Sequence, residues 1–217
     1  MGSDLKNRAS SEMEMAKRRQ RILAEGFRLF SKRPIDKVSM NEVAEASGIG
    51  IATLYRYYSD KPSLVVDIST QVWSEYIEST RSRPDSEAIR TMTAAQRFER
   101  FLDSFIDLYL NHRDMLRFNQ FFNIYAQSEG IPGDRLTPFT QVIRALAGRF
   151  HEIYETGQRD GTLRTEIPEQ KIFTSSLHLM LAAVTRYAVG VIYAEDSVQE
   201  ELSLLRNMLL REYTRAA

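Results

Sequence analysis

Cysteine is absent from the 217 residues of the chain, which excludes disulfide bonds and thiolate zinc sites. Continuous apolar runs of about 18 residues, the length that a membrane-spanning helix needs, are absent as well. The first residues lack the apolar core of a secretory signal peptide. We therefore expect a cytoplasmic protein with no membrane partner.

Histidine is also scarce, and His112, His151 and His178 do not have the spacing of metal ligands. The sequence contains no P-loop, nucleophile elbow or dinucleotide-binding fingerprint. Its carboxylates are scattered along the expected exposed helix faces. We expect no catalytic residue, no metal site and no cofactor, so the chain is not predicted to be an enzyme.

Lysine is nearly missing from the second part of the chain, where Lys171 is its one representative beyond residue 62. Residues 1–62 carry an excess of four positive charges, and the remainder an equal negative excess, so the net charge of zero hides a basic head on an acidic body. A basic head suggests an anionic partner, although a small excess of this kind can also arise by chance.

Helical periodicity dominates the chain, and convincing period-two strand patterns are missing. An all-α fold is predicted, with an N-terminal three-helix helix-turn-helix domain over residues 1–62 and a C-terminal helical domain over 63–217. Residues 1–10 are expected to be disordered. The expected helices cover about 11–31, 39–47, 51–57, 61–81, 93–111, 114–127, 135–158, 168–190 and 197–215, with a break at 81–86.

A helix-turn-helix is predicted from the spacing within residues 39–58. The sequence Ser39–Glu42 has the pattern of a capping box, which marks the start of a helix. Gly48 can adopt the positive φ of a tight turn, and Ala44 is small enough for two helices to approach. Ile49 and Leu54 can then fill the angle between the helices.

These segments resemble a known family. "RILAEGFRLF" at 21–30 and "VSMNEVAEASGIGIATLYRYYSDKPSLV" at 38–66 are similar to the DNA-binding domain of the tetracycline-repressor (TetR) family, and "TLYRYYSDKPSL" is the most specific part. The sequence departs from the family at Glu25 and Gly26, where Ala-Ala is usual, at Pro34, where glycine is usual nearby, and at Gly50, where a polar residue is frequent. Gly50 and Ile51 replace polar candidates for reading DNA.

DNA contacts are assigned to the helix-turn-helix in two groups. Hydroxyl and ammonium groups at helix ends suit phosphate oxygens, and the candidates are Ser39, Thr53, Tyr57 and Lys61. Arginine can bind guanine, and apolar side chains can pack on thymine methyl groups; the candidates for base edges are Asn41, Ile51, Ala52, Tyr55 and Arg56. The resemblance gives most support to Thr53, Tyr55, Tyr57 and Lys61.

Two features near the head allow more than one interpretation. Tyr55 and Tyr58 can pack the small domain instead of contacting DNA, and for Tyr58 we favour packing. The basic stretch 6–21 can contact phosphates or the minor groove, or it can be the solvated start of a helix.

Aromatic residues are concentrated in residues 98–125, which hold eight of the 22 aromatic residues of the chain. Aromatic stripes are usually core, but the resemblance implies an effector pocket among these helices. The expected lining residues are Trp73, Phe105, Tyr109, Asn119, Phe122, Tyr125 and His178. Such a pocket would suit a small, largely apolar or aromatic effector.

The last two helices are apolar over wider surfaces than one core requires, and residues 172–185 carry no charge. They can be buried within one chain, or pair with a second copy. The resemblance implies the second arrangement, a homodimer that addresses a palindromic double-stranded operator.

The sequence therefore predicts a ligand-responsive transcriptional regulator, with repression the favoured mode. Two alternatives stay open. One is an all-α small-molecule-binding protein or enzyme that keeps a head which does not read DNA. The other is a regulator that is controlled by a protein partner, which a body packed solid with aromatic side chains would favour.

Overall fold

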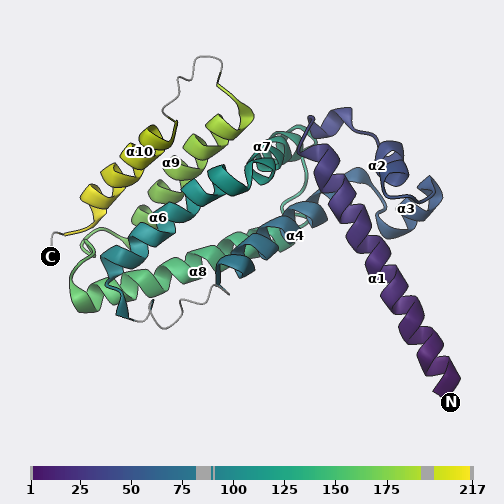
Figure 1. The fold of residues 1–217 in the computed structure, drawn as a ribbon, viewed down its shortest axis with the longest axis horizontal. Coiled ribbons are helices and arrows are strands. Elements are labelled where there is room, and N and C mark those ends of the chain that lie inside the picture. Colours follow the sequence, from purple (N-terminus) through teal and green to yellow (C-terminus); the bar gives the residue numbers. More distant parts are fainter. Residues whose placement is uncertain (1, 82–88, 90, 192–197, 216–217) are drawn as a thin grey trace. The chain divides into compact units, whose positions relative to one another are not determined.

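The computed structural model describes residues 2–81, 89, 91–191 and 198–215, and their side chains from residue 11 onward except that of residue 81. The described residues are helical throughout, apart from connections and one isolated β-bridge. The head contains α1 (Gly2–Phe30), the short 3₁₀ turn η1 (Ile35–Lys37), α2 (Met40–Ala46) and α3 (Ile51–Tyr57) (Figure 1). The remaining helices are α4 (Lys61–Arg81), α6 (Ala94–Asn111), α7 (Arg113–Ser128), α8 (Thr137–Asp160), α9 (Glu169–Val189) and α10 (Val198–Tyr213).

The all-α prediction is confirmed, and the bounds of α3 and α4 agree with those expected from the sequence. The first helix differs, because α1 begins at Gly2, and residues 2–10, for which disorder was expected, are helical. These residues contain no proline, so the backbone has no intrinsic break before Ser11. The expected break at 81–86 lies almost entirely outside the described residues.

The chain divides into two compact units that differ from the two predicted domains. The first unit comprises residues 1–73 and 118–139, and the second comprises 74–117 and 140–217. The sequence predicts a boundary after residue 62, but the first turns of α4 carry the apolar side chains Leu64, Val65 and Ile68, all fully buried in the core of the first unit. The helices α4, α7 and α8 each contribute residues to both units.

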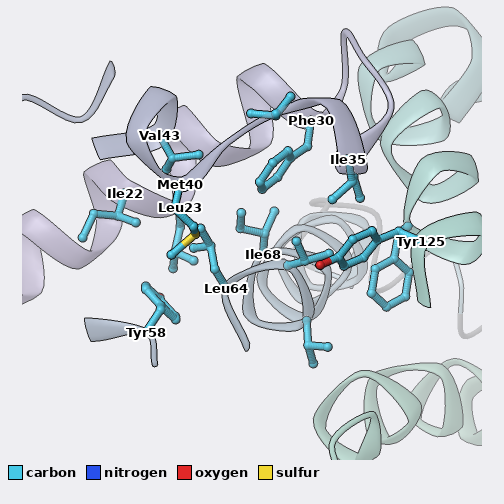
Figure 2. Close-up of a cluster of buried hydrophobic side chains, with 14 of the residues drawn as sticks. Ile22, Leu23, Phe30, Ile35, Met40, Val43, Tyr58, Leu64, Ile68 and Tyr125 are labelled. Carbon is cyan, nitrogen blue, oxygen red and sulfur yellow. The ribbon is translucent and has the colours of Figure 1, made fainter. Parts of the chain in front are cut away.

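The core of the first unit joins the three head helices to α4 and α7 (Figure 2). Phe30 of α1, Val43 of α2 and Leu54 of α3 are fully buried in it, beside Leu64 and Ile68 of α4. The same cluster contains side chains from α7 and from the connection that follows it, namely Phe118, Phe122, Tyr125 and Ile131. The head is therefore not an isolated three-helix domain, because α7 supplies part of its hydrophobic core.

A glycine turn ends α7 and sends the chain back into this core. Gly130 has a φ of 59°, and the N–H of Ile131 donates to the carbonyl of Ala126 at 3.0 Å. This is the hydrogen-bonding pattern of a Schellman motif, in which the apolar residue after the glycine packs against the helix. Ile131 is 8% exposed, so the α7–α8 connection starts from a buried anchor.

The second unit is built on aromatic packing. The rings of Phe98 and Phe101 of α6, Phe150 of α8 and Phe173 of α9 contact one another with centroid separations of 5.4 to 6.3 Å. The helices α6, α9 and α10 lie side by side in this unit (Figure 1). These rings fill the space between the helices, and each contributes to burial as well as to edge and stacking contacts.

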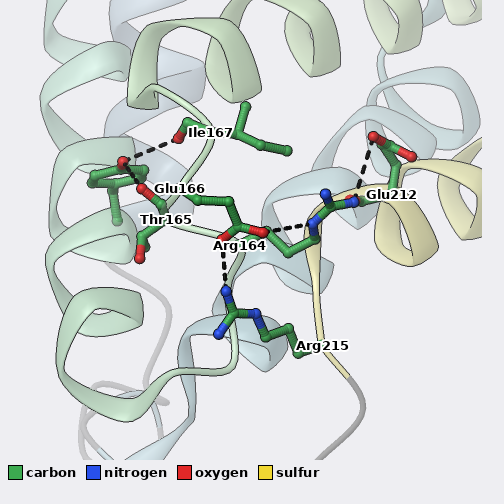
Figure 3. Close-up of polar contacts among 7 residues, drawn as sticks. Arg164, Thr165, Glu166, Ile167, Glu212 and Arg215 are labelled. Atoms are coloured by element: carbon green, nitrogen blue, oxygen red, sulfur yellow. Dashed lines mark hydrogen bonds and ion pairs between the residues drawn. The ribbon is translucent and has the colours of Figure 1, made fainter.

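The end of α10 is fastened to the connection between α8 and α9. Leu163 and Thr214 form an antiparallel β-bridge, and the carboxylate of Glu166 accepts from Arg164 at 3.0 Å and from Arg215 at 2.7 Å (Figure 3). In the same region the hydroxyl of Tyr154 donates to the carbonyls of Thr165 and Ile167, which places the connection on α8.

By length and composition, α9 could cross a membrane, with a mean hydropathy of 1.2 over its most apolar window. The same helix contributes buried residues to the second unit, where it packs against α6 and α10. These contacts are typical of a helix in the core of a folded domain, which passes the same test of length and composition.

Candidate DNA-binding surface

The helix α2 starts with the capping box that the sequence predicts. Ser39 Oγ accepts from the N–H of Glu42 at 3.2 Å, and Glu42 Oε2 accepts from the N–H of Ser39 at 2.7 Å. Glu42 also accepts from Arg33 at 2.6 Å. The backbone hydrogen bond from Ser39, followed by the one from Arg33, lowers the pKa of Glu42 to about 2. The hydroxyl proton of Ser39 points to Glu42 at 3.1 Å, so a phosphate would have to compete for it.

The turn between α2 and α3 has the predicted geometry. Gly48 has a φ of 63°, a conformation that favours glycine because it has no Cβ. The N–H of Ile49 donates to the carbonyl of Ala44 at 3.0 Å, and Ala44 is buried where the helices approach. Leu54 is fully buried from the other side, so the two short helices are fixed against each other.

The helix α3 presents a mixed face to solvent. Tyr55 is 51% exposed and Ile51 is 36% exposed, and Ala52 and Arg56 are exposed as well. Arg56 donates to the hydroxyl of Thr53 at 3.2 Å, which holds the guanidinium along the helix. The four residues expected at base edges on this helix therefore lie on its accessible side.

The remaining predicted contacts lie on α2, on α3 and at the start of α4. Asn41 of α2 is exposed, whereas Thr53, Tyr57 and Lys61 are half-buried. The side chain of Tyr57 packs against the head core. A half-buried residue at a helix end still presents its polar tip while its stem packs, so this exposure is compatible with phosphate contact.

Tyr58 belongs to the core, as expected. It is 6% exposed, and its hydroxyl donates to Asp67 Oδ2 at 2.5 Å. Arg19 donates to the same carboxylate at 2.6 and 2.8 Å. This network ties α1 to α4 through the residue that directly follows α3, so the tyrosines of this segment have different roles.

The basic stretch of α1 is partly engaged in ion pairs. Residues 11–20 are all exposed. Arg18 pairs with Glu14 at 3.4 Å and Arg19 with Asp67, whereas Lys17 and Arg21 have no such partner among the described side chains. The side chains of residues 6 and 8, part of the same predicted stretch, lie outside the described residues.

At the start of α4, Lys61 contacts a buried aromatic ring. Its Nζ lies 5.4 Å from the ring centroid of Tyr125, a distance at which a cation is attracted by the ring face. Partial desolvation lowers the pKa of Lys61, although nearby acidic residues oppose the shift. Burial raises the pKa of Tyr125 to about 12.

The seven predicted effector residues are divided between the two units. Trp73, Asn119, Phe122 and Tyr125 lie in the first unit, where all four are buried. Trp73 Nε1 donates to Asn119 Oδ1 at 3.2 Å. The rings of Phe122 and Phe139 make an edge-to-face contact with their centroids 5.0 Å apart. Trp73 and Asn119 are thus hydrogen-bonded to each other, and Phe122 and Tyr125 belong to the hydrophobic core of the first unit.

The other three predicted effector residues lie in the second unit. Phe105 is buried against Phe101 at 5.3 Å between centroids. Tyr109 contacts Tyr187 at 6.3 Å and lies under the guanidinium of Arg113 at 4.3 Å. His178, by contrast, is on the exposed side of α9. Helical periodicity could not predict which of these residues belong to which unit, because a row of aromatic side chains on one side of a helix has the same spacing in either unit.

Sequence reasoning also missed residues that support the head. Arg135 donates to Asp60 Oδ1 at 2.7 Å and to Ser63 Oγ at 2.6 Å, from 75 and 72 residues away. Nothing in the local sequence marks this contact. The described residues contain no cluster of three or more His, Asp or Glu side chains arranged to hold a metal ion.

The comparisons with known proteins match the head. Residues 22–68 match the sequence profile described as "Bacterial regulatory proteins, tetR family". An HTH-type transcriptional regulator of Staphylococcus aureus (strain USA300) is 44% identical over 46 residues, which are 21% of this chain and 25% of that protein. The chain thus matches about a quarter of the length of this curated relative.

Solved structures match over nearly the whole chain. A putative transcriptional regulator from Saccharomonospora viridis, in complex with choline, matches with a TM-score of 0.72 at 16% sequence identity. The match covers 93% of this chain and 100% of the Saccharomonospora viridis chain. The fatty acid degradation regulator FadR from Bacillus halodurans matches with a TM-score of 0.69 at 12% sequence identity, and the match covers 88% of this chain and 94% of the FadR chain. These likenesses concern the fold. Residues 22–68 are thus similar to the TetR family of bacterial regulatory proteins, and the chain as a whole shares the fold of these solved structures.

Proposed function

We propose that the protein is a DNA-binding transcriptional regulator that reads an operator with α3. The observation that carries this proposal is the division of α3 into two faces within a family-matched helix-turn-helix. Leu54 is fully buried, while Ile51 and Tyr55 are exposed. A short helix fixed from behind and accessible in front is the geometry that enters a major groove.

The residues of this surface take different roles in the proposal. Tyr57 and Lys61, at the end of α3 and the start of α4, bind phosphates, with Thr53 and Ser39 as further donors. Tyr55 and Arg56 reach base edges, together with Asn41 of α2. Ile51 and Ala52 pack against thymine methyl groups, because Gly50 and Ile51 offer no polar side chain at this point.

The active form in this proposal is a homodimer on a palindromic operator. Support comes from α9 and α10, whose exposed sides carry Leu179, Leu204 and Met208 at 40%, 59% and 53% exposure. Large exposed apolar side chains on neighbouring helices are typical of a protein interface. A second copy would bury the same surface by twofold symmetry and set the separation of two half-sites.

We further propose that the regulator is a cytoplasmic repressor, released by a small, largely apolar or aromatic effector. Such a ligand would bind in the second unit, near Phe105 and Tyr109. The aromatic content of this unit and the bound choline of the Saccharomonospora viridis regulator support a ligand role. The dense packing of Phe98, Phe101, Phe150 and Phe173 favours the alternative of control by a protein partner, so the experiment must separate the two.

The proposal is tested by selecting genomic DNA fragments with the purified protein and measuring the affinity of the recovered fragment. Tyr57→Phe and Lys61→Ala should weaken binding, and Lys61→Ala should also reduce the dependence of affinity on salt. Absence of any enriched fragment at low salt would overturn the DNA-reading role. Release of the fragment by apolar compounds, measured with the same protein, would support effector control, whereas a fragment released only by a protein would favour the alternative.

A further inference from the structure

The start of α4 places opposite charges next to each other. Asp60 caps the helix, since its Oδ1 accepts from the N–H of Ser63 at 2.8 Å, and Lys61 is the first helical residue. If Lys61 grips a DNA phosphate, as the proposed function holds, the adjacent carboxylate lies close enough to repel that phosphate. The Asp60 carboxylate stabilises the start of α4, but its negative charge weakens the binding of a nearby phosphate. Tight DNA binding therefore requires a positive charge that offsets it.

Arg135 supplies the offsetting charge. Its guanidinium lies 2.7 Å from Asp60 Oδ1 and 2.6 Å from Ser63 Oγ. Partial burial acts to raise the pKa of Asp60, but the hydrogen bonds from Arg135 and Ser63 outweigh it and lower that pKa. Asp60 is therefore a carboxylate whose negative charge is paired with a residue of the α7–α8 connection.

The same part of the chain also contacts the lysine. Tyr125, near the end of α7, faces the Lys61 ammonium across 5.4 Å, and the buried Ile131 anchors the connection that leads to Arg135. All of these residues belong to the first unit. Asp60 and Lys61 are thus each held by a residue that lies more than sixty positions later in the chain.

We propose that Arg135 is a positioning residue for DNA binding, which neutralises the Asp60 cap and so leaves the positive charge of Lys61 to a phosphate. Tyr125 assists by limiting the positions of the Lys61 side chain. This inference rests on the proposed function, and it adds a residue outside the helix-turn-helix to the determinants of its affinity.

A double-mutant cycle that neutralises each charge in turn tests the proposal on the DNA fragment recovered by genomic selection. The proteins are wild type, Arg135→Gln, Asp60→Asn and the double variant, and the readout is affinity as a function of salt. Asparagine keeps the helix cap, so Asp60→Asn removes charge without removing the hydrogen-bonding cap. Arg117→Gln is the matched control, because Arg117 forms a comparable ion pair with Asp114 and is about as exposed as Arg135.

Arg135→Gln should weaken binding about three- to tenfold at 0.1 M salt, the range expected of one partly screened charge. Asp60→Asn should bind at least as tightly as wild type, and the double variant should recover to within about twofold of it. Arg117→Gln should bind like wild type. Circular dichroism and thermal unfolding check that each variant is folded.

Two results would overturn the inference while leaving the proposed function intact. One is unchanged affinity of a folded Arg135→Gln protein. The other is a double variant as weak as Arg135→Gln, because loss of packing, unlike loss of charge, is not rescued by Asp60→Asn. Should Arg135→Gln fail to fold, weaker binding by Asp60→Asn alone would also contradict it. If wild type binds no fragment, it is the proposed function that fails.

Discussion

Arg19 and Asp67, which are 48 residues apart, form an ion pair in which one guanidinium nitrogen reaches both carboxylate oxygens, at 2.8 and 2.6 Å. Tyr58 donates to the same carboxylate at 2.5 Å. Three segments of the first unit, namely α1, the residue that follows α3, and α4, are therefore joined at one side chain. Because Tyr58 is buried and its partner is anionic, the network holds the phenol in its neutral form.

This network predicts that the head loses stability in alkali. Burial, followed by the hydrogen bond and the charge of Asp67, raises the pKa of Tyr58 above its ordinary value of 10.0, against the opposing effect of Arg19. Above pH 10 the unfolded chain releases this proton while the folded chain keeps it, so the free energy of unfolding falls as the pH rises. Tyr58→Phe should make this decline shallower by up to about 1.4 kcal/mol per pH unit.

The measurement is urea unfolding of wild type and Tyr58→Phe at several pH values between 9 and 11. Tyr55→Phe, at an exposed tyrosine of α3, is the control and should keep the wild-type slope. Equal slopes for all three proteins would contradict the role given to Tyr58.

The capping box of α2 predicts the opposite behaviour in acid. The hydrogen bonds from Ser39 and Arg33 lower the pKa of Glu42 from 4.5 to about 2. The stabilisation from this carboxylate is complete above pH 4.5 and is lost as the pH falls from 4.5 towards 2. Glu42→Gln keeps the capping hydrogen bonds and should flatten that part of the stability curve. A variant that retains the full acid dependence would show that other carboxylates cause it.

Two glycines of α8 should respond to alanine in opposite directions. A Cβ on Gly157 would lie 2.6 Å from the Cβ of Leu163 and 3.4 Å from the Cβ of Ala94, whereas nothing lies within 4 Å of one on Gly148. Gly157→Ala should destabilise the protein by about 1–3 kcal/mol through overpacking. Gly148→Ala should stabilise it by up to about 1 kcal/mol, since alanine is the better helix former. Denaturant midpoints compare them directly, and a stabilising Gly157→Ala would refute the close approach.

The apolar start of α3 predicts a dependence on thymine methyl groups. Replacing thymine by uracil in the selected fragment removes the methyl and changes nothing else on the major-groove edge. At a position that Ile51 contacts, the wild-type protein should lose about fourfold in affinity, the equivalent of roughly 0.8 kcal/mol for one buried methyl. Ile51→Ala should bind the two fragments with a smaller difference. If no thymine position is sensitive, Ile51 does not read methyl groups.

Local rules were sufficient for most of the head and insufficient for what holds it in place. The capping box, the positive φ of Gly48 and the burial of Leu54 all follow from short-range patterns, and the structure confirms them. The contact of Arg135 with Asp60 spans 75 residues, and such a pairing depends on the path of the whole chain. The division of the predicted effector residues between the two units could not be predicted for the same reason. Helical periodicity tells which side of a helix is buried, but it does not tell in which unit that side is buried.

Gly26 illustrates the same limit. From the sequence alone it is a weak point in α1, about 1 kcal/mol worse than alanine. In the structure a Cβ at this position would lie 2.6 Å from Ile68 Cδ1, so the glycine accommodates α4 where it crosses α1. The close approach of Ile68 therefore explains why glycine stands at this position in spite of its low helix propensity.

The exposed first half of α1 has a consequence for hydrogen exchange. Residues 11–20 bury no side chain, and the packed part of the helix starts with Ile22 and Leu23. Residues 11–18, before the ion pair of Arg19 with Asp67, are all exposed. A helical segment that buries no side chain is marginal in water, so its backbone hydrogen bonds open independently of the rest of the head. Amide protons before residue 20 should therefore exchange with solvent deuterium far faster than those of residues 22–30, although both stretches belong to one continuous helix.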